Sequence, residues 1–242
     1  MDWYENWFGS PFYKILYQNR DDQEAQEFIE NLLCYLKPAA GCKMLDIACG
    51  EGRHAKQLAE NGYDVTGIDI SHASIEAAKA YEQDNLQFFV QDMRYTFYIN
   101  YFDYSFNFFT SFGYFRSLRN HKEAARAFAA GLKKEGILVI DYLNGNYVTG
   151  HLVKDCVIER GSYKFKTSKK IENNHIVKDI NFVDADGKER HYAESVAMFS
   201  VADFEKMFGD AGMKLIDTFG DYKLNAYDAQ QSPRMVMVFK KM

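Results

Sequence analysis

A glycine-containing turn near residue 50 carries the side chains whose types and spacing point most directly to chemistry. Residues 44–55 read Met-Leu-Asp-Ile-Ala-Cys-Gly-Glu-Gly-Arg-His-Ala, so a short apolar run is followed by Gly50 and Gly52. A Cβ at either glycine would hold a ligand away from the backbone. From Arg53 onward the apolar residues have helical spacing, and the first turn of a helix offers unpaired N–H groups. The stretch therefore predicts a strand, a tight turn that receives a ligand, and a helix.

Carboxylates accompany the ends of the apolar runs. Asp46 lies inside the first run, Asp69 closes the second, and Asp92 follows the third. A carboxylate in a buried strand requires partners, and Asp46 can accept N–H groups of the turn or face a cationic ligand. Asp69 stands 17 residues after Gly52, near the distance at which a βαβ unit places an acid on two ribose hydroxyls. This spacing indicates a ligand that contains a ribose.

The same turn also fits the pattern G-x-G-x-x-A of nicotinamide-dependent enzymes, with Ala55 as its last residue. The pyrophosphate of a dinucleotide is negatively charged, and a carboxylate beside the turn would repel it. The positions of Asp46 and Asp92 therefore favour a ligand with positive groups. An NAD(P)-dependent oxidoreductase stays the less favoured alternative.

Apolar runs and helical patterns alternate along most of the chain, which is typical of a parallel sheet with helices on both faces. Ser71 has the position of a helix N-cap. Further strands are expected at 65–68, 86–90, 102–109, 136–140, 213–219 and 234–239, and helices at 124–132 and 201–208. We expect a doubly wound, mostly parallel, Rossmann-like α/β sheet of seven strands.

Residues 151–199 depart from this alternation. Period-2 patterns follow one another there without helices between them, and residues 184–187 read as a hairpin turn. These residues are predicted to form an inserted antiparallel meander. The rest of the chain divides into an aromatic arm with a helix at 1–37 and an α/β core at 38–150 and 200–242.

The arm is unusually aromatic. Its first 17 residues include Trp3, Tyr4, Trp7, Phe8, Phe12, Tyr13 and Tyr17. The arm either packs on the core or closes as a lid over a ligand cleft, because tyrosine and tryptophan combine apolar area with a polar tip. Tyr13, Tyr17 and Arg20 are the candidate lid residues.

Composition limits the classes of partner. The 242 residues are 47% hydrophobic and carry a formal charge of −5, which fits one sizeable core and argues against nucleic acid as a partner. The cysteines form no C-x-x-C pair and have no histidines at metal spacing, so we expect free thiols, no metal and a reducing compartment. No apolar run approaches the ~20 residues that a membrane span requires. We expect a cytoplasmic protein without membrane partners.

Motifs at three successive strand ends resemble those of the class I S-adenosylmethionine-dependent methyltransferases. They are residues 45–52 (Leu-Asp-Ile-Ala-Cys-Gly-Glu-Gly), 67–69 (Gly-Ile-Asp) and 91–93 (Gln-Asp-Met). The resemblance covers residues 40–145 and 200–242. The arm and the inserted meander are similar to those of small-molecule members, including amine and sugar N-methyltransferases. The family usually has glycine where Ala48 stands, and alanine is a common variant there.

The resemblance implies S-adenosylmethionine as cofactor and gives roles to single residues. Asp46, Ala48 and Gly50 would line its methionine part. Asp69 would accept hydrogen bonds from both ribose hydroxyls, and Asp92 would accept one from the adenine amino group. The remaining residues implied to contact the cofactor are Gly52 in the turn, Ile70 and Met93 around the adenine, and Tyr17 and Arg20 in the arm.

The methyl acceptor is expected off the carboxyl ends of the fourth and fifth strands. Residues 107–114 lack the Asn/Asp-Pro-Pro-aromatic motif of methyltransferases that act on bases, so a small amine, hydroxyl or carboxylate compound is the expected acceptor. In-line transfer mainly requires alignment and exclusion of water, so no general base is assigned. His54 is expected to face outward or to cap its helix. The candidates for positioning the acceptor are Tyr13, Ser111, Tyr114, Asp141 and Asn144.

Two alternatives stay open at this level. A module that binds the cofactor without transferring its methyl group has the same sequence signals. The inserted meander can cover the cleft or pair with a second copy, so both a monomer and a homodimer are compatible with the sequence.

Overall fold

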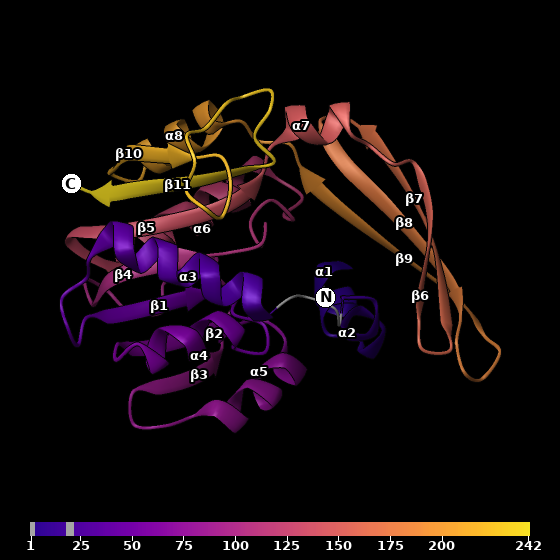
Figure 1. The fold of residues 1–242 in the computed structure, drawn as a ribbon, viewed down its shortest axis with the longest axis horizontal. Coiled ribbons are helices and arrows are strands. Elements are labelled where there is room, and N and C mark those ends of the chain that lie inside the picture. The colour runs from indigo at the N-terminus through magenta and orange to yellow at the C-terminus, as the bar shows by residue number, and fades with distance from the viewer. Residues whose placement is uncertain (1–2, 18–21) are drawn as a thin grey trace.

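The computed structural model describes residues 3–17 and 22–242 and contains two separate β-sheets (Figure 1). The larger sheet has seven strands in the order β10-β11-β5-β4-β1-β2-β3. Within the described residues, β11 is the one strand of this sheet that runs in the direction opposite to the others. The predicted doubly wound, mostly parallel sheet is confirmed. Its strands are β1 Lys43–Ile47, β2 Asp64–Asp69, β3 Leu86–Val90, β4 Phe102–Asn107, β5 Leu132–Leu143, β10 Met213–Phe219 and β11 Arg234–Lys241.

Helices cover both faces of the larger sheet (Figure 1). One layer contains α3 Asp22–Leu36, α4 Arg53–Glu60 and α5 His72–Ala78, followed by a 3₁₀ turn at Lys79–Tyr81. The other layer contains α6 Leu118–Gly131 and α8 Val201–Gly209. Each layer has its own buried apolar cluster against the sheet. The structure starts α6 at Leu118 rather than at residue 124, because the first turns of this helix are polar and carry no apolar period.

The smaller sheet is the predicted antiparallel meander. Its strands β6 Asp155–Arg160, β7 Tyr163–Glu172, β8 His175–Val183 and β9 Glu189–Ala197 pair in chain order. The short helix α7 Gly145–Gly150 leads into it from β5. In Figure 1 the smaller sheet stands beside the larger one, and the arm helices α1 Trp3–Phe8 and α2 Pro11–Tyr17 lie between them.

The arm shares a hydrophobic cluster with the smaller sheet. Trp7 of α1 and Leu16 of α2 are buried against Phe165, Ile180 and Phe182 of the inserted strands. Each of these side chains is at most 5% exposed. Burial of this apolar area stabilises the contact between arm and insert.

A polar joint at one edge of this cluster orients the arm. The carboxylate of Glu194 on β9 accepts a hydrogen bond from Trp7 Nε1 at 2.6 Å and one from the Tyr17 hydroxyl at 2.8 Å. Lys178 Nζ on β8 donates to the same hydroxyl at 2.7 Å. The side chains of Lys178 and Glu194 are only 10% and 14% exposed, so water weakens these bonds little. The joint fixes Tyr17 relative to the inserted strands.

His121 is a buried titratable group in the layer that contains α6. It is 2% exposed, and its ring lies against the rings of Phe112, Phe115 and Phe199. Its Nδ1 lies 2.9 Å from the carbonyl oxygen of Ser117. Loss of hydration lowers the pKa of His121 to about 4.

We predict that His121 makes the fold sensitive to acid. The unfolded chain binds a proton at this residue near pH 6.5, whereas the folded protein does so only near pH 4, so stability falls as the pH drops between these values. The loss from this residue amounts to about 3 kcal/mol. Urea unfolding of the wild type and of His121→Leu across this pH range measures it. The variant should lose less stability with acid, and equal losses would contradict the prediction.

Candidate active site

A cleft of about 310 Å³ lies at the carboxyl ends of the parallel strands. Its walls come from the arm, the turn after β1, the segments that follow β2 and β3, and the loop after β4. Residues 151–199 are all described by the structure, and none of them lines the cleft. The cleft is therefore formed by the core and the arm. The inserted sheet contacts the arm through Glu194, and it contacts the loop after β4 through a hydrogen bond from the Ala197 N–H to the carbonyl oxygen of Gly113.

The turn after β1 has a left-handed backbone at three positions. The angle φ is 60° at Ala48, 58° at Gly50 and 83° at Gly52. A Cβ on Gly50 would meet no atom within 4 Å, whereas a Cβ on Gly52 would lie 2.5 Å from the ring of Phe88. Gly50 and Ala48 line the cleft, but Gly52 does not. Gly50 thus leaves room for a ligand, while Gly52 makes room for a core ring, which differs from the expectation that both serve the ligand.

Asp69 joins this turn to the following helix. Its two carboxylate oxygens accept hydrogen bonds from the N–H of Gly50 at 3.0 Å and of Ser71 at 2.8 Å. Burial raises the pKa of Asp69, although these N–H groups oppose the shift. Each oxygen can accept a further hydrogen bond, and Asp69 lines the cleft. The arrangement fits a ligand with two neighbouring hydroxyl donors.

Asp92 follows β3 and is held by Arg94. The Nε and Nη2 atoms of Arg94 lie 2.9 and 2.6 Å from one oxygen of Asp92. The guanidinium also lies over the ring of Phe115, 5.4 Å from its centroid. Both charged side chains are less than a fifth exposed, so the pair is well ordered against the wall. Ile70 and Met93, the residues predicted to flank an adenine, line the same cleft.

Asp46 is a buried carboxylate that lines the cleft. It is 1% exposed, and within the described structure its Oδ2 has no hydrogen-bond partner. Burial, assisted by the negative charge of Asp69, raises the pKa of Asp46 to about 8, although the N–H of Ala55 and the charge of Arg53 oppose the shift. A buried oxygen without a partner is costly. The site fits a ligand that brings a positive group or a donor to Asp46.

Asp141 and Asn144 were predicted to hold the acceptor, but neither lines the cleft. Asp141 is fully buried, where it accepts from the N–H of Phe109 at 2.8 Å and from Arg234 Nε at 2.7 Å. Asn144 donates to two carbonyl oxygens of the segment before β11. Both side chains form hydrogen bonds that support loops. The sequence-based assignment of Asp141 and Asn144 to the acceptor is therefore wrong.

The loop that Asp141 supports is a wall of the cleft with strained backbone. Phe109 and Thr110 have φ angles of 55° and 58°, which are uncommon for residues other than glycine. Arg234 Nη2 donates to Thr110 Oγ1 at 3.0 Å, and the Tyr222 hydroxyl donates to Asp141 at 3.1 Å. This buried network stabilises the unusual turn and fixes the position of the wall.

The arm and this loop together form an aromatic wall, which consists of Tyr4, Phe8, Tyr13, Tyr114 and Phe115. The ring of Phe8 lies 5.0 Å from the rings of both Tyr13 and Tyr114. Tyr4 lies edge-on to Phe115 at 5.9 Å. Two of the predicted acceptor-positioning residues, Tyr13 and Tyr114, are therefore brought together here.

The other predicted site residues have different placements. Ser111 lines the cleft, and its hydroxyl donates to a carbonyl of its own loop at 2.8 Å. Tyr17 also lines the cleft, with its hydroxyl bound to Glu194. Arg20, predicted to contact the cofactor, lies outside the described residues.

Sequence reasoning did not assign His54, Lys14, Glu51 or Arg53 to the site, although all four line the cleft. His54 was expected to face outward, yet it is 7% exposed and lies 4.7 Å from Phe108 and 5.2 Å from Phe109, measured between ring centroids. Its position four residues before the buried Leu58 placed it on the inner helix face, so the signal was present. Lys14 of the arm also lines the cleft and had no sequence signal.

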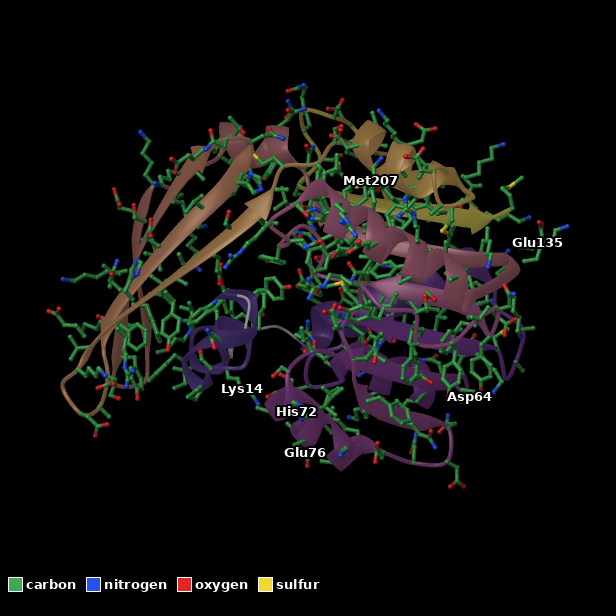
Figure 2. All side chains as sticks on the ribbon, turned by 180° about the vertical axis from the view of Figure 1, so that it is seen from behind. Lys14, Asp64, His72, Glu76, Glu135 and Met207 are labelled. Carbon is green, nitrogen blue, oxygen red and sulfur yellow. The ribbon has the colours of Figure 1, made fainter. Side chains whose placement is uncertain are left out.

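Lys14 forms a charged contact between the arm and the core. Its Nζ lies 2.5 Å from the carboxylate of Glu51 in the glycine turn and 3.4 Å from the carbonyl oxygen of Ala73. Figure 2 shows Lys14 on the side of the arm that faces His72 at the start of α5. Both members of the ion pair are at least one third exposed, so the contact is weak and salt-dependent.

Two absences apply to the described part of the chain. Residues 3–17 and 22–242 contain no group of three or more histidine, cysteine, aspartate or glutamate side chains arranged to hold a metal ion. None of the helices in these ranges is long and apolar enough to cross a membrane.

Comparison with known proteins places these features in a family. The family described as "Methyltransferase domain" matches residues 17–218. A putative methyltransferase of Geobacillus sp. is 25% identical over 227 residues, which cover 89% of this chain and 91% of the relative. The dTDP-3-amino-3,4,6-trideoxy-alpha-D-glucopyranose N,N-dimethyltransferase of Streptomyces venezuelae is 26% identical over 212 residues, or 84% and 89% of the two chains. The sugar N-methyltransferase KedS8 of Streptoalloteichus shares the fold, with a TM-score of 0.73 at 21% identity over 95% of this chain and 91% of KedS8.

The two glycines of the turn should respond differently to alanine. Gly52→Ala forces a Cβ into the Phe88 ring in addition to the left-handed backbone, and we expect a loss of about 2–4 kcal/mol in unfolding free energy. Gly50→Ala meets no atom, so it should cost only about 1 kcal/mol but weaken binding of S-adenosylmethionine at least tenfold. Urea unfolding and calorimetric titration check both. Equal stability losses, or unchanged binding in Gly50→Ala, would contradict this division of roles.

Asp46 should limit the stability of the ligand-free protein. The pKa of Asp46 is about 8 in the folded protein and about 4 in the unfolded chain. The contribution of Asp46 to the free energy of unfolding is therefore fully present below about pH 4 and is lost as the pH rises toward 8. Asp46→Asn keeps the shape without the titration, and we expect a gain of up to about 4 kcal/mol in unfolding free energy at pH 7. Denaturant unfolding at pH 5 and 7 measures it. A variant less stable than the wild type at pH 7 would disprove the prediction.

Proposed function

The chain belongs to the class I S-adenosylmethionine-dependent methyltransferases, and from this premise we propose that it methylates the amino group of a small molecule. When bound, S-adenosylmethionine supplies a methyl group that is electrophilic because it is attached to a positively charged sulfur. The names of the Streptomyces relative and of KedS8 specify N-methylation of sugars, which supports an amino sugar as the first acceptor class to test.

The cofactor would be held by residues at the strand ends. Asp69 would accept hydrogen bonds from the two ribose hydroxyls on the lone pairs that its bonds to backbone N–H groups leave open. Asp92, oriented by Arg94, would accept one from the adenine amino group. Ile70 and Met93 would contact the adenine, and Asp46 would pair with a positive group of the cofactor. The placement of these side chains along the cleft supports the roles.

The main observation in favour of an amine acceptor is the aromatic wall. Aromatic rings attract a positive charge, and a protonated amine or the amine developing charge during transfer benefits from them. The charge balance of the cleft favours the same class, because its carboxylates outnumber its lysine and arginine side chains among the described lining residues. These residues are the carboxylates of Glu51, Asp69 and Asp92, joined by Asp46 when it is ionised, and the cations Lys14 and Arg53. A carboxylate acceptor would be repelled by this balance.

Methyl transfer asks the protein mainly for alignment. The attacking nitrogen must lie in line with the sulfur–carbon bond, and water must be kept out. The arm covers the cleft, and the Tyr13 and Tyr114 side chains offer hydroxyl groups within the aromatic wall. Tyr114 stands on the loop held by Asp141 and Arg234, which gives the acceptor side a fixed frame.

Titration and methyl-transfer assays test this function together. We expect micromolar binding of S-adenosylmethionine and S-adenosylhomocysteine, none of NADH, and transfer of a labelled methyl group to a nucleotide-linked 3-amino sugar. The matched sugar with a hydroxyl group at the same carbon should receive no label. Transfer to the hydroxyl sugar alone would overturn the amine assignment, and cofactor binding without transfer to any amine would favour the non-catalytic alternative.

A pair of arm variants tests the aromatic wall. Phe8 belongs to the wall, whereas Phe12 packs on Phe182 and Tyr163 of the insert and does not line the cleft. Phe8→Leu should raise the KM for the amine about fivefold, the equivalent of one cation–π contact of about 1 kcal/mol. Phe12→Leu, the matched control, should leave the KM unchanged. Equal KM values for both variants would remove the wall from acceptor binding.

A further inference from the structure

Asp46 is unusual among the carboxylates of the cleft because neighbouring donors and cations do not balance a negative charge on it. It stands in the buried part of β1, it is 1% exposed, and its Oδ2 lacks a hydrogen-bond partner within the described structure. By contrast, each oxygen of Asp69 accepts a backbone N–H, and Asp92 is paired with Arg94. Both oxygens of Asp69 thus have partners and Asp92 has a cation, whereas one oxygen of Asp46 has neither.

The charged and titratable groups around Asp46 come from three neighbouring elements. Asp69 at the end of β2 adds negative charge, and the thiol of Cys49 in the turn adds none while protonated. Burial raises the pKa of the Cys49 thiol, so it stays neutral. Arg53 at the start of α4 lowers the pKa of Asp46 but does not outweigh burial, and His54 on the same helix lines the cleft. Glu51 in the turn is paired with Lys14.

We propose that Asp46 carries a proton in the ligand-free protein and releases it when a positive group of S-adenosylmethionine enters the cleft. The inference rests on the proposed function, because it places the cofactor at this wall. The O–H bond of Asp46 breaks, the proton passes to solvent, and the carboxylate left behind pairs with the ammonium or the sulfonium of the cofactor. The positive group of the cofactor thus replaces the proton of Asp46, and the net charge buried at this carboxylate does not change on binding.

This exchange makes cofactor binding depend on pH in a defined direction. Below pH 8, where the acid is protonated in the free protein, each unit of falling pH adds a tenfold cost for releasing the proton. As the pH rises from 6 to 7.5, the dissociation constant of S-adenosylmethionine should therefore fall about tenfold per pH unit, and it should level off above pH 8. A site whose carboxylate is already charged would show no such slope in this range.

Calorimetric titration counts the proton directly. The observed heat of binding at pH 7, measured in buffers with different ionisation heats, gives the number of protons released. We expect a release that approaches one proton for the wild type and none for Asp46→Asn, whose affinity should also lose its pH slope. Asp92→Asn is the matched control, because it weakens binding in the same cleft but should keep the proton release. The amino group of the cofactor itself can only take up a proton on pairing, which has the opposite sign to the expected release.

Further ligands identify the positive group that replaces the proton. S-adenosylhomocysteine retains the ammonium but has a neutral sulfur, and 5′-methylthioadenosine has neither charge. Equal release with S-adenosylhomocysteine assigns the ammonium as partner of Asp46, and release with S-adenosylmethionine alone assigns the sulfonium. Either result supports the exchange.

Three results would overturn it. They are binding of S-adenosylmethionine to the wild type without proton release, the same release from Asp46→Asn, and release with 5′-methylthioadenosine. The first of these leaves the methyltransferase assignment intact, whereas no binding of S-adenosylmethionine at all would overturn the proposed function as well.

Discussion

The two backbone hydrogen bonds of the Asp69 carboxylate determine how the ligand-facing parts of the core sit together. One bond holds the turn after β1 through Gly50, and the other holds the start of α5 through Ser71. Beneath the turn, the ring of Phe88 fills the space that Gly52 and Gly67 leave open. Turn, sheet and helix are therefore fixed to one another before a ligand arrives, and the carboxylate that fixes them is itself exposed to the cleft.

The arm forms the other side of the cleft and is held in a different way. The arm comes first in the sequence, yet Trp7 and Leu16 share an apolar cluster with strands near residues 160 to 195, while Tyr4 belongs to the cluster of the α/β core. Glu194 connects the arm to these strands through Trp7 and Tyr17. Toward the core, the arm packs through the buried ring of Tyr4, through the ring of Phe8 and through the exposed ion pair of Lys14 with Glu51. The arm is therefore held from both sides, by the insert and by the core.

The fold and the cofactor side of the cleft could be predicted from local signals. Apolar period, the glycines of the turn and the acids at the strand ends are all contained within short stretches, and most of the implied cofactor residues line the cleft. Asp141 could not be read in this way, because its role depends on Arg234, which reaches it only when β11 pairs with β5. The hydrogen bond from Trp7 to Glu194 likewise joins residues 187 positions apart. Contacts of this kind follow from the strand order and not from any local pattern.

Residues 151–199 contribute no side chain to the cleft wall, so substitutions in them affect the cleft only indirectly. The cleft is lined by residues of the core and the arm, so substitutions on the outward face of the inserted strands leave its lining unchanged. Substitutions on the inward face act on the aromatic wall through the position of α1 and α2. The two faces of the insert are therefore under different constraints: the inward face must keep its fit to the arm, whereas the outward face is free to vary.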